Sequence, residues 1–138
     1  MNCNKYLPHN ENPIPLKELH ETAPLVLSMI GDGVHTLFIR AMLFESNMYK
    51  NSILHKEVSM QVCANKQAEL ADKIEPLLTE EEMRIYKKAK NAKVNTVPKN
   101  STLITYKKAT AFEAITGYLY LASQTDRLAE LYDVIYND

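Results

Sequence analysis

The sequence predicts an all-α fold, with five or six helices in one domain over residues 16–138. Apolar residues recur at helical spacing, and no stretch shows the strict alternation of a half-buried strand. A chain of 138 residues can bury a core of its own, and no internal repeat divides it. Cys3 and Cys63 stand far apart without metal-ligand spacing, which favours a reduced, cytoplasmic protein over a disulfide-linked one.

The N-terminal part predicts a lead-in and two helices. Residues 1–15 contain three prolines and are expected to be loosely ordered. A short helix is expected at residues 16–22. Pro24 suits the first turn of a second helix that runs to about Glu45, with Thr22 as its cap. Apolar residues cover most of the circumference of this second helix, which predicts a central helix or a subunit interface.

No contact with a membrane is expected. The N-terminus is polar and carries no signal peptide. The most apolar run of the chain is interrupted by Arg40 and Glu45, so no stretch approaches a membrane span.

The middle of the chain predicts a connection and two more helices. Residues 47–52 form a polar connection. Residues 54–74 predict one helix with alanines along one side, which Pro76 should end. Thr79 and Glu82 fit a capping box, in which each side chain bonds to the other residue's backbone. The neighbouring acids are therefore expected to be structural.

The C-terminal half predicts a loop and two further helices. The capped helix is expected to end near Lys90, and residues 91–101 form a polar, basic loop. Residues 103–122 predict a largely uncharged helix. Thr125 is expected to cap the last helix, which has a single apolar stripe. That stripe consists of Leu128, Leu131, Tyr132 and Ile135.

Two isolated carboxylates lie in the two most apolar helices. Asp32 lies between Gly31 and Gly33, and Glu113 lies one turn before Gly117, which completes the three glycines of the chain. Each glycine inside a helix costs about 1 kcal/mol relative to alanine, and an unpaired charge in an apolar helix costs more. If the helices cross at their glycines, the carboxylates meet. The alternative is a pair of packing glycines with Asp32 facing water.

The two carboxylates together predict a metal site. Two close, partly buried carboxylates repel each other unless a proton or a divalent cation lies between them. Oxygen ligands without a cluster of Cys or His favour Mg²⁺, or Mn²⁺, over zinc. Asp32 and Glu113 are therefore the candidate metal ligands and catalytic residues.

A strongly basic segment predicts a polyanionic partner. Residues 83–112 carry eight basic residues and no acid, although the formal net charge of the chain is −1. Such one-sided charge is typical of a surface that binds nucleic acid. The alternative is a solvated basic face without a partner. His55, judged alone, is more simply an exposed surface histidine.

Several of these residues belong to blocks that resemble the ribonuclease III catalytic domain, and within it the small bacterial Mini-ribonuclease III family. The blocks match in order: residues 27–33 (LSMIGDG) resemble L-A-Y-I-G-D-A, residues 54–55 match L-H, residues 63–68 (CANKQA) resemble S-A-x-x-Q-A, residues 88–93 (KAKNAK) resemble R-G-R-N-A-K, residues 98–100 match P-K-N, and residues 109–121 match A-T-A-F-E-A…G-Y-L-F-L.

The chain also departs from these patterns. Full-length ribonuclease III has further acids where Ser28 and Thr110 stand here, and the small family lacks them too. Gly33 replaces a usual alanine, and lysines replace two arginines of the basic loop, which removes the planar fork of arginine but keeps its charge. The sequence leaves room for one helix after the catalytic motif, and none for a double-stranded-RNA-binding domain.

The resemblance implies a homodimeric, Mg²⁺-dependent endoribonuclease that cuts double-stranded RNA and leaves 5′-phosphate and 3′-hydroxyl ends. It also implies that Asp32 and Glu113 hold the metal, with Ser28 and Thr110 bonding to its waters. The implied substrate is the precursor of the large-subunit (23S) ribosomal RNA, with a ribosomal protein as a candidate helper. The residues expected to contact RNA are His55, Lys88, Lys90, Asn91, Lys93, Lys99 and Asn100.

Two alternatives stay open. One is a catalytically silent module that binds RNA with the same fold. The other is an all-α nucleotide pyrophosphohydrolase, which needs acidic pairs at helical spacing around a metal cluster. The only dense acids, Glu80 to Glu82, are better explained by helix capping.

Overall fold

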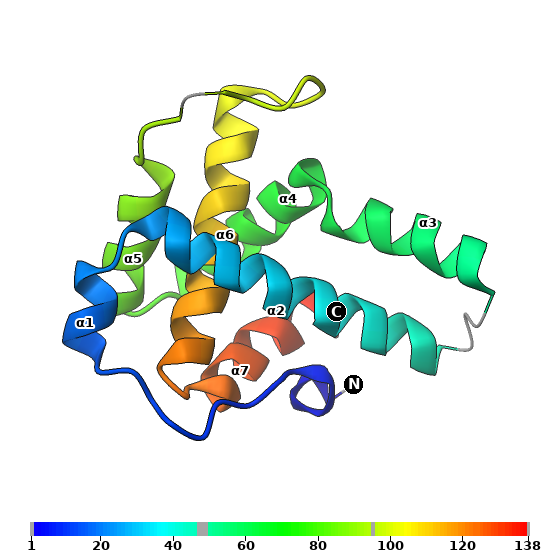
Figure 1. Cartoon of the computed structure of the whole chain (residues 1–138), viewed down its shortest axis with the longest axis horizontal. Coiled ribbons are helices and arrows are strands. Elements are labelled where there is room, and N and C mark those ends of the chain that lie inside the picture. Colours follow the sequence, from blue (N-terminus) through cyan, green and yellow to red (C-terminus); the bar gives the residue numbers. More distant parts are fainter. Residues whose placement is uncertain (1, 47–49, 95, 138) are drawn as a thin grey trace.

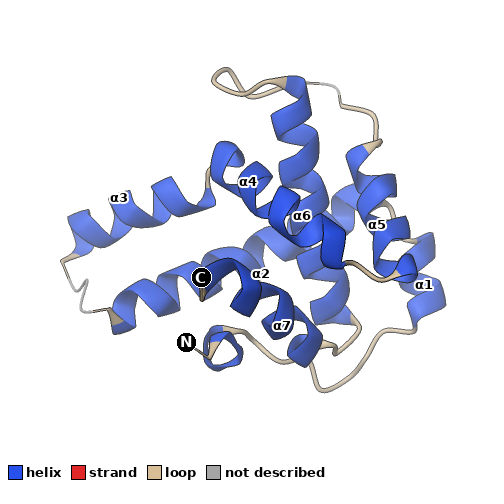
Figure 2. Cartoon of the chain, turned by 180° about the vertical axis from the view of Figure 1, so that it is seen from behind, coloured by secondary structure: helices blue, strands red, loops and turns tan. Residues whose placement is uncertain are grey.

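The computed structural model describes residues 2–46, 50–94 and 96–137 of the chain. These residues form helices and the connections between them, and none of them forms a strand, which confirms the all-α prediction (Figures 1 and 2). In chain order the elements are η1 (Cys3–Tyr6), α1 (Leu16–Glu21), α2 (Pro24–Glu45), α3 (Asn51–Val62), α4 (Ala64–Ile74), η2 (Glu75–Leu77), α5 (Glu80–Lys90), α6 (Leu103–Leu121) and α7 (Thr125–Tyr136).

The helices α2 and α6 cross near the middle of the molecule, and their backbones touch where each carries a glycine (Figure 1). A side-chain carbon at Gly31 would overlap the backbone carbonyl of Glu113, and one at Gly117 would overlap the backbone carbonyl of Leu27. The expected crossing of the two helices is therefore confirmed. Gly33 differs, because a side-chain carbon there would meet nothing within 4 Å.

The core is built around α6, which packs against α2, α4, α5 and α7. Every residue from Ala109 to Leu119 is buried except Glu113, which is half-buried. The four residues of the predicted stripe on α7 are also buried. Aromatic rings fill the space between α2, α6 and α7; Phe38 and Tyr132 meet edge to face with ring centroids 4.7 Å apart.

A chain of polar groups runs through this aromatic core. The Nδ1 atom of His35 lies 2.7 Å from the hydroxyl of Tyr132, which lies 3.4 Å from the hydroxyl of Thr116. Thr116 in turn donates to the backbone carbonyl of Phe112 at 3.1 Å. Burial lowers the pKa of His35 to about 3, so the imidazole is neutral. These hydrogen-bonded groups link α2, α6 and α7 one helical turn beyond the two carboxylates.

The sequence predicts a single helix over residues 54–74, whereas the structure has two. The break is at Cys63, whose backbone is extended with φ −69° and ψ 159°. The physical reason is that α3 lies along α2 while α4 packs against α6, so one straight helix would not reach both surfaces (Figure 1). Of the polar connection expected at 47–52, residues 47–49 lie outside the described residues, and Asn51 already begins α3.

The expected capping box at the start of α5 is confirmed. The hydroxyl of Thr79 accepts from the backbone N–H of Glu82 at 3.2 Å, and Glu82 accepts from the backbone N–H of Thr79 at 2.9 Å. Glu82 also pairs with Arg127 of α7 at 2.9 Å. This acid is therefore occupied in holding α5 against α7.

Two other predicted caps are wrong. Thr22 follows α1 and donates to the carbonyl of Glu18 at 2.8 Å, so it ends α1 and does not cap α2. Thr125 is the first residue of α7 and donates to the carbonyl of Pro8 at 3.5 Å. In both cases the hydroxyl bonds to a carbonyl outside the helix that it was expected to cap.

The N-terminal segment, expected to be loosely ordered, packs against the rest of the chain. Cys3 and Leu7 are buried. The backbone N–H of Cys3 donates to the carboxylate of Asp133 at 3.1 Å, and that of Ile14 donates to the carbonyl of Leu121 at 2.9 Å. Because these partners lie in α7 and at the end of α6, the segment reaches across the molecule to both (Figure 1).

Contrary to the sequence expectation, α2 is long and apolar enough to cross a membrane by length and composition. Core helices of soluble proteins can have the same length and apolar composition, so these two properties are weak evidence for a membrane span. Eight residues of α2, among them Leu27 and Phe38, are buried within the domain. The helix thus serves as a core helix in this structure.

Candidate active site

The crossing of α2 and α6 brings Asp32 and Glu113 to one cavity of about 430 Å³. Asp32 is exposed at its mouth and Glu113 is half-buried. The helix α4 adds Ala64 and Gln67 to the wall. The other lining residues are Leu25, Ser28, Met29, Pro98, Tyr106, Ala109 and Thr110.

The environment of Glu113 favours its protonated form. The pKa of this carboxyl is raised to about 8; burial is the largest cause, followed by a hydrogen bond with Asp32 and the negative charge of Asp32. Hydrogen bonds from Gln67 and Ser28 lower the pKa but do not outweigh these causes. Without a cation, Glu113 therefore keeps its proton near neutral pH.

Neutral donors hold both oxygens of Glu113. The hydroxyl of Ser28 donates to Oε1 at 3.3 Å, and the side-chain amide of Gln67 donates to Oε2 at 3.4 Å. The hydroxyl of Thr110 lines the same cavity but donates to the carbonyl of Tyr106 at 2.9 Å. Ser28 and Gln67 thus contact the carboxylate, whereas Thr110 bonds to its own helix.

The donor set suits a hard divalent cation. Two carboxylates, a hydroxyl and an amide all offer oxygen, the ligand atom that Mg²⁺ prefers. The raised pKa of Glu113 shows a site that a positive charge would stabilise. Among the described residues no group of three or more His, Cys, Asp or Glu gathers, so Asp32 and Glu113 would hold such a cation as the two charged ligands.

Comparison with known proteins gives the family. The ribonuclease III domain matches residues 25–124, which include both carboxylates and the whole basic segment. The chain belongs to the ribonuclease III family. It is therefore a ribonuclease, a hydrolase of the ribonuclease III type, and enzymes of this type act on double-stranded RNA.

Individual relatives agree with this assignment. The chain is 42% identical over 112 residues to a Mini-ribonuclease 3 from Thermoanaerobacter sp. (strain X514), covering 81% of this chain and 79% of that protein. It is 37% identical over 124 residues to a Mini-ribonuclease 3 from Clostridium tetani, covering 88% and 81%. The crystal structure of a protein from Fusobacterium nucleatum superposes with a TM-score of 0.76 at 33% identity, covering 84% of this chain and 94% of that chain.

The ribonuclease III domain places part of the basic segment beside the carboxylates. Lys99 and Asn100 line a cavity of about 260 Å³ that shares Ala64 and Pro98 with the carboxylate cavity. The loop that carries them therefore borders the site. Lys99 and Asn100 are exposed, as a surface that meets a polyanion requires.

The remaining basic residues differ in their partners. Lys88 donates to the backbone carbonyl of His20 at 2.9 Å, and Lys108 pairs with Asp72 at 2.9 Å. Lys90 and Lys93 have no ion pair to any of the described residues. Asn91, at the end of α5, is exposed between them.

His55 lies apart from the carboxylates within the chain. It sits on α3 and lines a cavity of about 230 Å³ with Arg40, Asn51, Leu54 and Val58. None of these residues borders the carboxylate cavity. The expected grouping of His55 with the basic loop is thus not seen within one chain.

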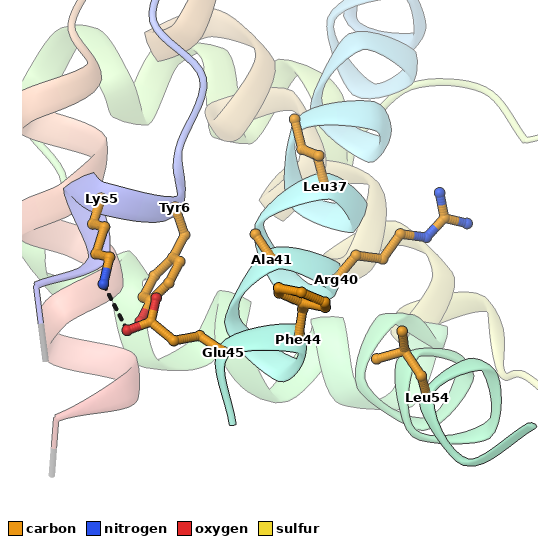
Figure 3. Close-up of a pocket in the computed structure, with 8 residues that line it drawn as sticks. All are labelled: Lys5, Tyr6, Leu37, Arg40, Ala41, Phe44, Glu45 and Leu54. Atoms are coloured by element: carbon orange, nitrogen blue, oxygen red, sulfur yellow. Dashed lines mark hydrogen bonds and ion pairs between the residues drawn. The ribbon is translucent and has the colours of Figure 1, made fainter. Parts of the chain in front are cut away.

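A larger cavity, of about 630 Å³, lies at the C-terminal end of α2 and contains neither carboxylate. Figure 3 shows Leu37 and Phe44 on α2 and Leu54 on α3, with Lys5 paired to Glu45 at one side. Its one lining carboxylate, Glu45, is paired with Lys5 at 2.6 Å, and no second carboxylate lines the cavity to hold a cation with it. The candidate active site is therefore identified by its two carboxylates and not by the volume of its cavity.

Gln67 is the site residue that the sequence alone did not single out. It is buried and contacts Glu113, yet it lies in an alanine-rich helix where glutamine is an ordinary helix former. A signal did exist. Gln67 shares one helical face with Ala64, Ala71 and Ile74, and an uncharged polar residue on an apolar face needs a buried partner.

Proposed function

We propose that the chain is a divalent-metal-dependent endoribonuclease that hydrolyses phosphodiester bonds in double-stranded RNA at the Asp32–Glu113 cavity. The observation that carries this proposal is the contact of α2 and α6 at Gly31 and Gly117, which brings two carboxylates to one cavity. Two carboxylates that share one partly buried cavity need a cation to be ionised together. Mg²⁺, or Mn²⁺ in its place, fits their oxygen donors.

Asp32 and Glu113 have the metal-holding role in this proposal. A divalent cation bound there would lower the pKa of water and neutralise charge on the phosphodiester. Ser28 and Gln67 orient Glu113 through the hydrogen bonds described above. Thr110, whose hydroxyl oxygen keeps free acceptor capacity at the cavity wall, is assigned to bond water there.

We propose that RNA lies along the basic side of this cavity. Lys88, Lys90, Asn91, Lys93, Lys99 and Asn100 are the assigned contacts. Lysines recognise phosphates as point charges, and a paired RNA is recognised mainly by its shape and backbone. His55 is assigned to RNA through the second chain of a dimer, because it does not reach the cavity of its own chain.

A homodimer is part of the proposal. The exposed fractions of Phe44, Leu37 and Val26 on α2, which lie outside the carboxylate cavity, are 58%, 50% and 45%. A helix that exposes several large apolar side chains is suited to an interface between copies. Two active sites related by a two-fold axis would cut both strands. Sedimentation velocity showing a fully active monomer at micromolar concentration would contradict this assignment.

The biological setting is proposed from what the family resemblance implies. The substrate proposed is the 23S ribosomal RNA precursor in the cytoplasm, presented with the help of a ribosomal protein. Residues 16–138 are proposed as one catalytic domain. Incubation of the protein with a precursor stem and Mg²⁺, followed by mapping of the ends, should give cuts with 5′-phosphate and 3′-hydroxyl termini.

The carboxylates are tested in the same assay. Asp32→Asn and Glu113→Gln should each abolish cleavage and still bind the duplex. The matched control is Glu81→Gln, which removes an exposed carboxylate from the acid cluster of α5 and should cleave normally. Cleavage by either site variant at a rate near that of the wild type would disprove the assignment. A wild-type protein that binds duplex without cutting it would favour the silent RNA-binding alternative.

A further inference from the structure

We propose that Gln67 is a positioning residue of the metal site and holds the Glu113 carboxylate in one orientation from the side of α4. This inference rests on the metal-holding role in the proposed function. It adds a third helix to a site whose charged groups come from two. The residue is a positioning residue because it acts through Glu113.

The geometry shows how one carboxylate is fixed from two sides. Each of its oxygens accepts one hydrogen bond, Oε1 from Ser28 on α2 and Oε2 from Gln67 on α4. A rotation of the carboxylate about its terminal bond would break both hydrogen bonds. Ala64, the other residue that α4 contributes to the cavity, has no side-chain donor. Gln67 is therefore the side-chain donor by which α4 reaches the site.

Burying the side-chain amide of Gln67 costs free energy, which its hydrogen bond to Glu113 must offset. Its exposed fraction is 3%, and a buried amide destabilises the fold unless it finds a hydrogen-bond partner. Its neighbours Ala68 and Ala71 are small and buried, so a leucine in its place would bury more apolar surface. A polar side chain is nevertheless present at this position of α4, and its hydrogen-bond partner there is Glu113.

The neutrality of the amide suits a site that must bind a cation. A carboxylate in this place would add a third negative charge next to Asp32 and Glu113. A lysine would pair with Glu113 and compete with the cation for it. Glutamine orients the carboxylate while leaving its negative charge available.

The test compares Gln67→Leu and Gln67→Met with the wild type. Metal-free protein is titrated with Mn²⁺ by calorimetry, and the kcat and KM for a duplex RNA are measured. Loss of a group that orients a metal ligand weakens metal affinity or activity by roughly 10–100-fold. We expect the Kd for Mn²⁺ to rise and kcat to fall by that factor. The KM for RNA, and RNA binding in EDTA, should stay within about twofold.

The control is Gln61→Leu, which removes a half-buried glutamine of α3 that does not line the carboxylate cavity. It should match the wild type in metal affinity and kcat. If Gln67→Leu and Gln67→Met also bind Mn²⁺ and turn over like the wild type, the proposal is overturned, whatever their melting temperatures. A structural role alone would lower the melting temperature without moving the Mn²⁺ affinity.

A measurement on wild-type protein covers the case in which the variants do not fold. In ¹⁵N-labelled protein, the side-chain amide resonances of Gln67 should shift on addition of Mg²⁺, and those of Gln61 should not. If the chemical shifts of the Gln67 side-chain amide do not change on addition of Mg²⁺, the proposal is overturned. A wild-type protein that cuts no duplex, but whose Mn²⁺ affinity falls when Gln67 is replaced, would remove the proposed RNA substrate and leave the positioning role intact.

Discussion

Replacement of Glu113 by glutamine should make the metal-free protein more stable, by an amount that grows with pH. The folded protein keeps the Glu113 proton up to a pKa of about 8, whereas the unfolded chain releases it near 4.5. Wild-type stability is therefore lost as the pH rises from about 4.5 through about 8. Glutamine has the shape of the protonated side chain and does not titrate, so the variant escapes this loss.

The size of the effect follows from the two pKa values. Between them, the free energy of unfolding falls by about 1.4 kcal/mol per pH unit. From pH 5 to pH 9 the loss due to Glu113 is about 4 kcal/mol, a large part of the 5–15 kcal/mol typical of a domain. Asp32→Asn should recover a smaller part, because burial, the largest cause of the raised pKa, remains.

The assay is urea denaturation in EDTA at pH 5, 7 and 9. The quantity compared is the difference in the free energy of unfolding between Glu113→Gln and the wild type, since other titrating groups cancel in it. Glu81→Gln serves as the control, with a difference that stays flat. A flat difference for Glu113→Gln as well would refute the link between burial, Asp32 and the pKa. Millimolar Mg²⁺ should stabilise the wild type and Glu81→Gln, but not Glu113→Gln.

Three further results are expected. Alanine at both Lys90 and Lys93 should weaken RNA binding about equally for different paired sequences, and cleavage at saturating RNA should be largely kept. The slope of log K against log salt concentration should become flatter by roughly one unit per lost phosphate contact. An unchanged slope in a filter-binding titration would mean that RNA binds to another part of the surface. In thermal denaturation, Gly31→Ala should cost about 1–3 kcal/mol or more, because its new methyl group meets the Glu113 carbonyl, whereas Gly33→Ala should stabilise the protein by up to about 1 kcal/mol. His35 has a folded pKa of about 3, below its ordinary 6.5, so it makes stability fall as the pH drops below 6.5, by about 2 kcal/mol at pH 5; urea titrations should show that His35→Phe lacks this loss.

Much of the fold and the charged centre of the site could be predicted from the sequence. Asp32 and Glu113 stood out because each is a lone acid in an apolar helix beside a glycine, and backbone contact between helices needs such glycines. The capping box at Thr79 and the stripe on α7 were equally readable, because both depend on residues three or four positions apart. Local spacing is the information that a single sequence displays directly.

Features that depend on distant partners could not be predicted. The break at Cys63 carries no proline or glycine, and it follows from the different surfaces that α3 and α4 must cover. Gln67 stands on an apolar helix face and so signals a buried partner, but that this partner is Glu113 is known only from the structure. The hydroxyl of Thr125 bonds to Pro8, far away in the sequence, so an expected local cap became a tertiary contact.

The N-terminal segment has a consequence for the order in which the chain folds. Cys3 bonds to Asp133, 130 residues later, and the side chain of Asn10 bonds to the carbonyl of Leu121, 111 residues later. A ribosome releases residues 2–15 first, yet their partners are made almost last. Each contact closes a very long loop, which is slow and entropically costly. We therefore expect the earliest-made segment to dock late, after translation has delivered α7.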